Sequence, residues 1–176
     1  VNVIQRSESI GLVGCGVNLM NFQGEVTGQL LAKNYVSKKA LLDDLLIRNV
    51  VIGSSSGSLI RRICFETVGM FDESLTSAED WDMWLRVTGS YEIWFAEKPL
   101  VKIRVHGNGM HKDVERMKAN QKRVIEKNLS SVGKRYKGKA YSYVYQDAAR
   151  EYYAADRKFS ALINLWKAIW RYPGRV

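Results

Sequence analysis

The residues with the clearest potential for chemistry lie in one short stretch, LTSAEDWDMWLRVTG, at positions 75–89. Three acidic side chains, Glu79, Asp80 and Asp82, stand beside two tryptophans there. A positioned carboxylate that is partly shielded from water can take a proton from a substrate hydroxyl. The stretch therefore predicts a general base or, alternatively, the acidic first turn of an ordinary helix.

The structural alternative explains every residue of the stretch, and the local pattern favours it. Ser77 and Asp80 fit a capping box, in which the acid accepts a hydrogen bond from the backbone amide of the capping residue. Asp82 and Arg86 are four residues apart, which predicts a surface ion pair. Helical spacing predicts one buried face comprising Trp81, Trp84, Leu85 and Thr88.

Two strand patterns stand on either side of this stretch in the sequence. GLVGCGVNLMN, at 11–21, is apolar, its glycines allow close backbone approach, and a turn carrying Gly24 follows it. YEIWFAEKPLVKIRVHG, at 91–107, predicts a pair of short strands split near Pro99.

Helical patterns lie between the strands. SKKALLDDLLIRN, at 37–49, has leucines at helical spacing and Ser37 as a possible N-cap. RRICFETVG, at 61–69, predicts a brief helix that stops at Gly69. A Gly/Ser-rich turn, 53–58, connects the two. Strands and helices together predict the α/β class.

The last third of the sequence is predicted to be helical throughout. One helix contains residues 114–129, and Gly133 and Gly138 are expected to interrupt the chain before the next helix. Two antiparallel helices joined at 155–156 should follow, and together they resemble a single tetratricopeptide-like hairpin. Their facing sides are predicted to comprise Tyr141, Tyr145, Ala148, Ala149 and Tyr152 on one helix, and Leu162, Leu165, Trp166 and Ile169 on the other.

Composition is that of a soluble globular protein, with 46% hydrophobic and 26% charged residues among 176. Cys15 and Cys64 lack metal-ligand spacing, which indicates reduced thiols and a cytoplasmic location. No apolar run approaches the roughly 20 residues that a membrane-spanning helix needs. The sequence begins at Val1 within an apparent element, so we expect a piece of a longer protein.

Positive charge is concentrated in one window of the sequence. The formal net charge is +9, and residues 112–139 contain ten basic and three acidic residues. Such a patch attracts polyanions, including nucleic acid and anionic lipid headgroups. A solvated helix face is the simpler interpretation.

Several motifs, in the same order and spacing, resemble the C-terminal, acceptor-side half of family 2 glycosyltransferases with the GT-A fold. The resemblance covers roughly residues 10–111. It consists of a serine-rich turn, a basic pair, a loop of the type F-x-x-V-G-x-F-D-E, a helix of the type E-D-x-D-x-W-x-R and a strand ending in R-x-H. The matching positions are Ser55, Ser56, Arg61, Arg62, Phe65, Gly69, Phe71, Asp72, Glu73, Glu79, Asp80, Asp82, Trp84, Arg86, Arg104 and His106.

The resemblance implies a role for each matching site residue. Asp80 would be the general base of an inverting sugar transfer to an acceptor hydroxyl, and Glu79 would orient the acceptor. His106, whose default role is packing or surface, would lie near a metal or the diphosphate leaving group. The substrate-binding residues would be Asp82, Trp81, Trp84, Arg86, Ser55 and Ser56, with Arg86 expected chiefly to hold the acidic cluster.

The resemblance also implies an architecture in two parts. Residues 1–111 would form a partial GT-A (Rossmann-like) sheet with flanking helices, and residues 112–176 an all-helical extension ending in the hairpin. The donor-binding half of the family, with its nucleotide-gripping strand and metal-binding D-x-D, has no match here. Asp80-Trp81-Asp82 spells D-x-D, but it follows LTSAE rather than an apolar strand, so we reject the metal interpretation.

A complete enzyme of this type would use Mn²⁺ or Mg²⁺, a nucleotide-sugar donor and a glycan or lipid-linked acceptor, as in bacterial polysaccharide synthesis. This chain alone should be inactive. Residues 112–139 would give it peripheral contact with an anionic membrane at the inner face. Two alternatives are a basic nucleic-acid-binding module and a non-catalytic adaptor. The tyrosines fall in a core-like helical pattern rather than on a stacking surface, so no nucleic acid is expected.

Overall fold

The computed structural model describes residues 2–106, 109, 112–129 and 134–174, except for the side chains of Ser54, Lys134 and Arg135. The chain forms two compact units, which are described separately. The first comprises Val1–Leu45, Asn49–Asp72 and Asp80–Gly107, and the second comprises Leu46–Arg48, Glu73–Glu79 and Asn108–Val176. The predicted domain boundary at residue 111 lies outside the described residues.

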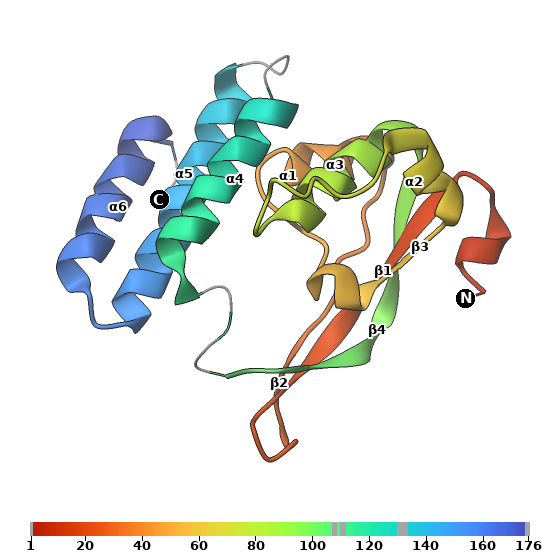
Figure 1. The fold of residues 1–176 in the computed structure, drawn as a ribbon, viewed down its shortest axis with the longest axis horizontal. Coiled ribbons are helices and arrows are strands. Elements are labelled where there is room, and N and C mark those ends of the chain that lie inside the picture. Colours follow the sequence, from red (N-terminus) through yellow and green to blue (C-terminus); the bar gives the residue numbers. More distant parts are fainter. Residues whose placement is uncertain (1, 107–108, 110–111, 130–133, 175–176) are drawn as a thin grey trace. The chain divides into compact units, whose positions relative to one another are not determined.

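The first unit contains a four-stranded mixed sheet built around β1 (Ile10–Met20). β2 (Val26–Leu30) and β3 (Ser58–Ile60) pair with it antiparallel, whereas β4 (Glu92–Arg104) runs beside it in parallel (Figure 1). Most of β1 is buried, as expected for the strand that all the others join. The sheet and its helices confirm the α/β class and fit a GT-A-like fold.

A glycine in β1 shows why this strand tolerates close neighbours. A Cβ atom at Gly16 would lie 2.8 Å from the carbonyl oxygen of Leu30, so a larger residue there would push β2 away. The turn between the two strands contains Gly24 at φ 89°, a backbone conformation that favours glycine. Both features agree with the predicted strand and turn.

The prediction of two strands split near Pro99 is wrong, because β4 is one strand of 13 residues. Its pairing with β1 passes from Ala96 opposite Cys15 to Pro99 opposite Gly16, with an irregularity in the register between them. Proline lacks an N–H donor and is tolerated at such an irregularity. The chain therefore keeps its direction through Pro99 instead of ending the strand there.

Three helices accompany the sheet in the first unit. α1 (Lys38–Leu45) begins after Ser37, whose Oγ accepts a hydrogen bond from the amide of Ala40 at 3.1 Å. α2 (Arg62–Val68) ends at Gly69, where φ is 83°. α3 (Glu79–Ser90) has 12 residues, about three turns. All three agree with the sequence predictions, and two short 3-10 helices add to them, η1 (Ile4–Arg6) and η2 (Ser54–Gly57).

The cysteines are both free and buried. The thiol of Cys64 in α2 lies 3.4 Å from the carbonyl oxygen of Gly11 in β1, to which it donates. Burial raises the pKa of the Cys64 thiol, which disfavours the thiolate. Cys64 therefore acts as a small packing residue between α2 and the sheet, and Cys15 is a buried residue of β1.

The second unit contains α4 (Val114–Asn128), α5 (Lys134–Ala154) and α6 (Lys158–Arg171). α5 and α6 are two helices that pack together and are joined by a short turn with Asp156 at φ 55°, and their likeness to a tetratricopeptide hairpin stays a prediction. Gly138 lies inside α5 rather than before it, so the predicted break at this residue is wrong. Helical glycine costs only about 1 kcal/mol relative to alanine, which a long helix tolerates. The break predicted at Gly133 lies outside the described residues.

Two similar side-chain clusters join α4 to α5. Glu115 accepts hydrogen bonds from Lys118 and Tyr152, and Glu126 accepts them from Lys137 and Tyr141. These contacts hold the pKa of each carboxyl below its ordinary value, with the lysine as the larger cause in both cases. Each end of the helix pair is thus fixed by one acid, one lysine and one tyrosine.

The predicted inner face of α6 is wrong. Three of its four residues are exposed, since Leu162, Trp166 and Ile169 are 64%, 65% and 46% accessible to solvent. The buried side of α6 consists instead of Ala161, Asn164 and Ala168. Small residues let two helices approach closely, and the tyrosine-rich α5 supplies the bulk on its own side. No helix within the described ranges is long and apolar enough to cross a bilayer.

Candidate active site

The carboxylate of Asp80 lies at the start of α3 and is held from two sides. Its Oδ1 accepts a hydrogen bond from the backbone amide of Trp81 at 2.7 Å. Its Oδ2 accepts one from Nδ2 of Asn49 at 3.0 Å. Asp80 is 7% exposed, so it is largely, but not completely, shielded from solvent. Each carboxylate oxygen keeps a lone pair that no protein donor among the described residues uses.

Asn49 is the residue of this site that sequence reasoning missed. Its Oδ1 also accepts a hydrogen bond from the backbone amide of Val51, at 3.1 Å, which fixes the direction of its amide group. The side chain therefore presents a defined donor to Asp80, 31 residues further along the chain. Its local signal is a polar residue at the end of the leucine-rich stretch 37–49, and this does not identify the partner.

The predicted capping box at the start of α3 does not form. The hydroxyl of Ser77 is buried and has no hydrogen-bond partner among the described residues. Ala78 has φ 60°, a left-handed conformation that turns the chain just before the helix begins at Glu79. Asp80 accordingly uses its carboxylate on Trp81 and Asn49. Glu79 is half-buried at the first position of the helix.

Asp82 and Arg86 form the predicted ion pair, at 2.9 Å, but it is not a surface pair. Asp82 is fully buried, and the Arg86 side chain is 20% exposed. The guanidinium also donates to three successive carbonyl oxygens, those of Val68, Gly69 and Met70. Arg86 thus ties the loop after α2 to α3, which agrees with its expected role in holding the acidic cluster.

The two tryptophans of α3 are almost completely buried. Trp81 is 2% exposed, and its indole nitrogen donates to the carbonyl oxygen of Leu45, at the end of α1, at 2.7 Å. Trp84 has no exposed surface, packs edge-on against Phe71, and its indole nitrogen has no partner among the described residues. The predicted buried face is therefore confirmed, and both rings hold α3 in place.

The remaining predicted site residues lie on other elements of the first unit. Ser55 and Ser56 are exposed on η2, after Gly53 at φ 80°. His106 is exposed two residues beyond the end of β4. Arg104, at that strand end, donates to the carbonyl oxygens of Asn21 and Phe22 in the turn between β1 and β2. No group of three or more His, Cys, Asp or Glu side chains suitable for a metal occurs in the described part of the chain.

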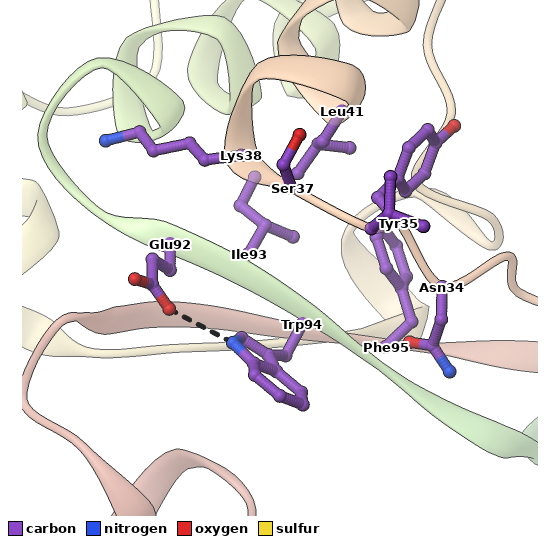
Figure 2. Close-up of a pocket in the computed structure, with 10 residues that line it drawn as sticks. Asn34, Tyr35, Ser37, Lys38, Leu41, Glu92, Ile93, Trp94 and Phe95 are labelled. Atoms are coloured by element: carbon purple, nitrogen blue, oxygen red, sulfur yellow. Dashed lines mark hydrogen bonds between the residues drawn. The ribbon is translucent and has the colours of Figure 1, made fainter.

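A separate pocket of about 280 Å³ lies on β4 of the first unit (Figure 2). It is lined by residues 34–38, Leu41 and residues 92–95. The Trp94 indole is 45% exposed, and its nitrogen donates to Oε2 of Glu92 at 3.2 Å. The pocket combines aromatic surface with hydrogen-bonding groups, and its lining includes none of the residues predicted to bind substrate or metal.

Comparisons with known proteins relate most of this chain to one family. The protein-family model described as "Glycosyltransferase like family 2" matches residues 17–150. Two similar relatives are uncharacterized glycosyltransferases of Rickettsia typhi and Rickettsia prowazekii. Each is 28% identical to this chain over 109 residues, which are 60% of this chain and 34% of the relative. The alignment thus spans about a third of these relatives' length.

Proposed function

Because this chain belongs to glycosyltransferase-like family 2, we propose that it is the acceptor-side half of an enzyme that transfers a sugar from a nucleotide-sugar donor to an acceptor hydroxyl. The observation that carries this proposal is the carboxylate of Asp80, fixed at the start of α3 by Asn49 and by the amide of Trp81. All residues predicted for catalysis and substrate binding fall within the family match.

Asp80 acts as general base in the proposed reaction. The acceptor oxygen forms a bond to the anomeric carbon, the bond to the nucleoside diphosphate breaks, and the acceptor proton passes to the carboxylate. The configuration of the sugar is thereby inverted. A carboxylate with one lone pair free on each oxygen can accept that hydroxyl without losing its hydrogen bonds to Asn49 and Trp81.

The neighbouring residues have different parts in the proposal. Glu79 orients the acceptor, and the exposed Ser55 and Ser56 form part of the acceptor wall. The burial of Trp81 and Trp84, and the pairing of Asp82 with Arg86, support positioning roles through α3 rather than direct contact with substrate. His106 is exposed and is proposed, as before, to lie near the metal or the leaving diphosphate.

Donor and metal binding are assigned to the other half of the complete protein. The resemblance assigns the nucleotide-gripping strand and the D-x-D motif to a region that this chain does not match. The carboxylates of Asp80 and Asp82 have different partners, Asn49 and Arg86, which gives no support to a shared metal. We therefore expect the D-x-D ligands of Mn²⁺ or Mg²⁺ to lie outside residues 1–176, with His106 near the metal or the diphosphate, and these residues alone to be inactive.

The experiment that tests the proposal compares the complete protein with residues 1–176 in the release of nucleoside diphosphate from a panel of nucleotide sugars. The complete protein should release it in a metal-dependent reaction that an acceptor accelerates. The shorter chain should release none above background. Robust metal-dependent turnover by residues 1–176 would contradict the division of labour proposed here.

Peripheral membrane contact through residues 112–139 is part of the same proposal. Several cations of this window have partners within the second unit, since Lys118 pairs with Glu115, Lys137 pairs with Glu126, and Arg123 donates to Ser74. These contacts leave less of the charge to attract an anionic surface. The nucleic-acid alternative gains no support from this region, because Tyr145 and Tyr152 are buried and cannot stack on bases.

A further inference from the structure

The outer face of α6 is an apolar surface that nothing in the second unit covers. Trp166 and Trp170 are 65% and 71% exposed, Phe159 is 78% exposed and Leu162 is 64% exposed. These residues recur every three or four positions, so they lie on one side of the helix. Ala161, Asn164 and Ala168 occupy the opposite, buried side. α6, drawn in blue beside α5 in Figure 1, is thus amphipathic, and its larger apolar face is the exposed one.

Cations border this face on both sides. Lys158 precedes Leu162 by four positions at one edge, and Lys167 follows Ile163 by four at the other. Both lysines are exposed, and α6 contains no acidic residue. Asp156, in the turn before the helix, pairs with Lys158 at 3.3 Å and is the nearest negative charge in the sequence. The face therefore combines large apolar side chains with a cationic margin.

A groove extends the apolar surface onto α5. Its volume is about 610 Å³, and its lining includes Ala149 and Tyr153 of α5 and Leu162 and Leu165 of α6. Tyr153 is 69% exposed. The apolar surface is therefore continuous across two helices rather than confined to one row of side chains.

We propose that α6 lies in the interface of an anionic lipid bilayer, with Trp166, Trp170 and Phe159 inserted among the acyl chains. Lys158 and Lys167 would then meet the phosphate groups. A lipid interface fits better than a protein groove, because tryptophan, an apolar face and flanking lysines without acids are the features of interfacial helices. With 14 residues, α6 is too short to span the roughly 20-residue thickness of a bilayer and would lie along its surface.

This inference deepens the proposed membrane contact and moves it from residues 112–139 to α6. It does not depend on sugar transfer, because lipid binding needs no turnover. α6 also lies outside the family match at 17–150, so its surface is a property of this chain rather than of the matched family region.

Vesicle flotation of the complete protein tests the inference. Wild-type protein should float with vesicles of phosphatidylcholine and phosphatidylglycerol, and less with phosphatidylcholine alone. The double variant Trp166→Ser/Trp170→Ser should lose at least about tenfold in partitioning, because two large apolar side chains are removed from the interface. Lys158→Gln and Lys167→Gln should each lose about fivefold, on the anionic vesicles only. Phe22→Ser is the matched control, since Phe22 is 75% exposed in the first unit.

Three results would overturn the inference. The first is equal flotation of wild type and the double tryptophan variant. The second is a dimer in solution that Trp166→Ser/Trp170→Ser dissociates, without vesicle binding, which would make a second copy the occupant. The third is tryptophan fluorescence in the complete protein that brominated lipids do not quench. Asp80→Asn should float like wild type, which separates failure here from failure of the proposed transfer reaction.

Discussion

At the scale of single residues, the candidate site depends on how the two oxygens of Asp80 are shared. One is fixed by the helix itself, through the amide of Trp81, and the other by Asn49 from a distant part of the chain. Because Asn49 is itself oriented by the amide of Val51, the carboxylate is held in one position before substrate binds. Such preorganisation is what a general base requires.

Replacing Asn49 with alanine should slow turnover while leaving the donor site intact. A hydrogen bond to a charged group contributes about 1.5–3 kcal/mol, so loss of the Asn49–Asp80 contact should lower kcat about 10-fold to 100-fold. The measurement is kcat and KM for the complete protein, together with its melting temperature. Asn18→Ala is the control, because the side chain of Asn18 accepts a hydrogen bond from Gln29 in the sheet. An unchanged kcat for Asn49→Ala would refute the positioning role.

The contacts of α3 show which interactions could be predicted from residue spacing and which could not. The ion pair of Asp82 with Arg86 and the buried face with both tryptophans followed from spacing alone, because positions three and four apart meet on a helix. The prediction of a capping box was wrong because Ala78 adopts a left-handed conformation between Ser77 and the helix, and this turn depends on the path of the preceding loop. Asn49 was missed because its contact with Asp80 joins residues 31 positions apart.

At the scale of elements, local signals fixed helix ends, and tertiary packing decided which faces were buried. Ser37 caps the start of α1 and Gly69 follows the end of α2, both as expected, since capping acts within a few residues. In α6 the apolar residues pointed to the wrong face, because hydrophobic periodicity does not say whether a partner covers it. The strand break predicted near Pro99 was wrong for a related reason, because the irregular register between β1 and β4 accommodates the proline.

The clusters between α4 and α5 should make the stability of the second unit depend on pH. The pKa of Glu115 is lowered in the folded state, chiefly by the hydrogen bond from Lys118 and then by that from Tyr152. Its contribution is therefore complete above the ordinary value of 4.5 and is lost as the pH falls through the lower, folded pKa. Glu115→Gln should show a weaker loss of stability in acid than wild type.

Urea unfolding, followed at a series of pH values from neutral to below 4.5, measures this effect. Glu97→Gln is the control, because Glu97 is exposed on β4 and should follow the wild-type dependence. Identical acid dependence in Glu115→Gln and wild type would show that the contacts of Glu115 with Lys118 and Tyr152 do not contribute to folding stability.

At the scale of the whole molecule, the family match and the two units divide the chain differently. The match runs from 17 to 150, so it includes the sheet unit as well as α4 and most of α5. α6 stands outside it and carries the uncovered apolar face. The net charge of +9 and the lysines at the margins of that face are the charges on which the proposed lipid contact rests.

The class of fold and the family were predictable from this sequence because many motifs agree in order across roughly a hundred residues. The partner of each charged side chain was not predictable, because Lys118, Arg123 and Lys137 contact partners that come near them only in the folded unit. The same holds for the pocket beside Trp94, whose walls come from residues 34–38 and 92–95.

The most direct test of the central claim is the kinetics of Asp80→Asn in the complete protein. The amide keeps the shape of the side chain but cannot take the acceptor proton, so kcat should fall about 100-fold to 10,000-fold while donor affinity stays within error. Asp43→Asn, which removes a carboxylate paired with Lys39 on α1, should retain full activity. Turnover of Asp80→Asn close to that of wild type would show that Asp80 is not the base.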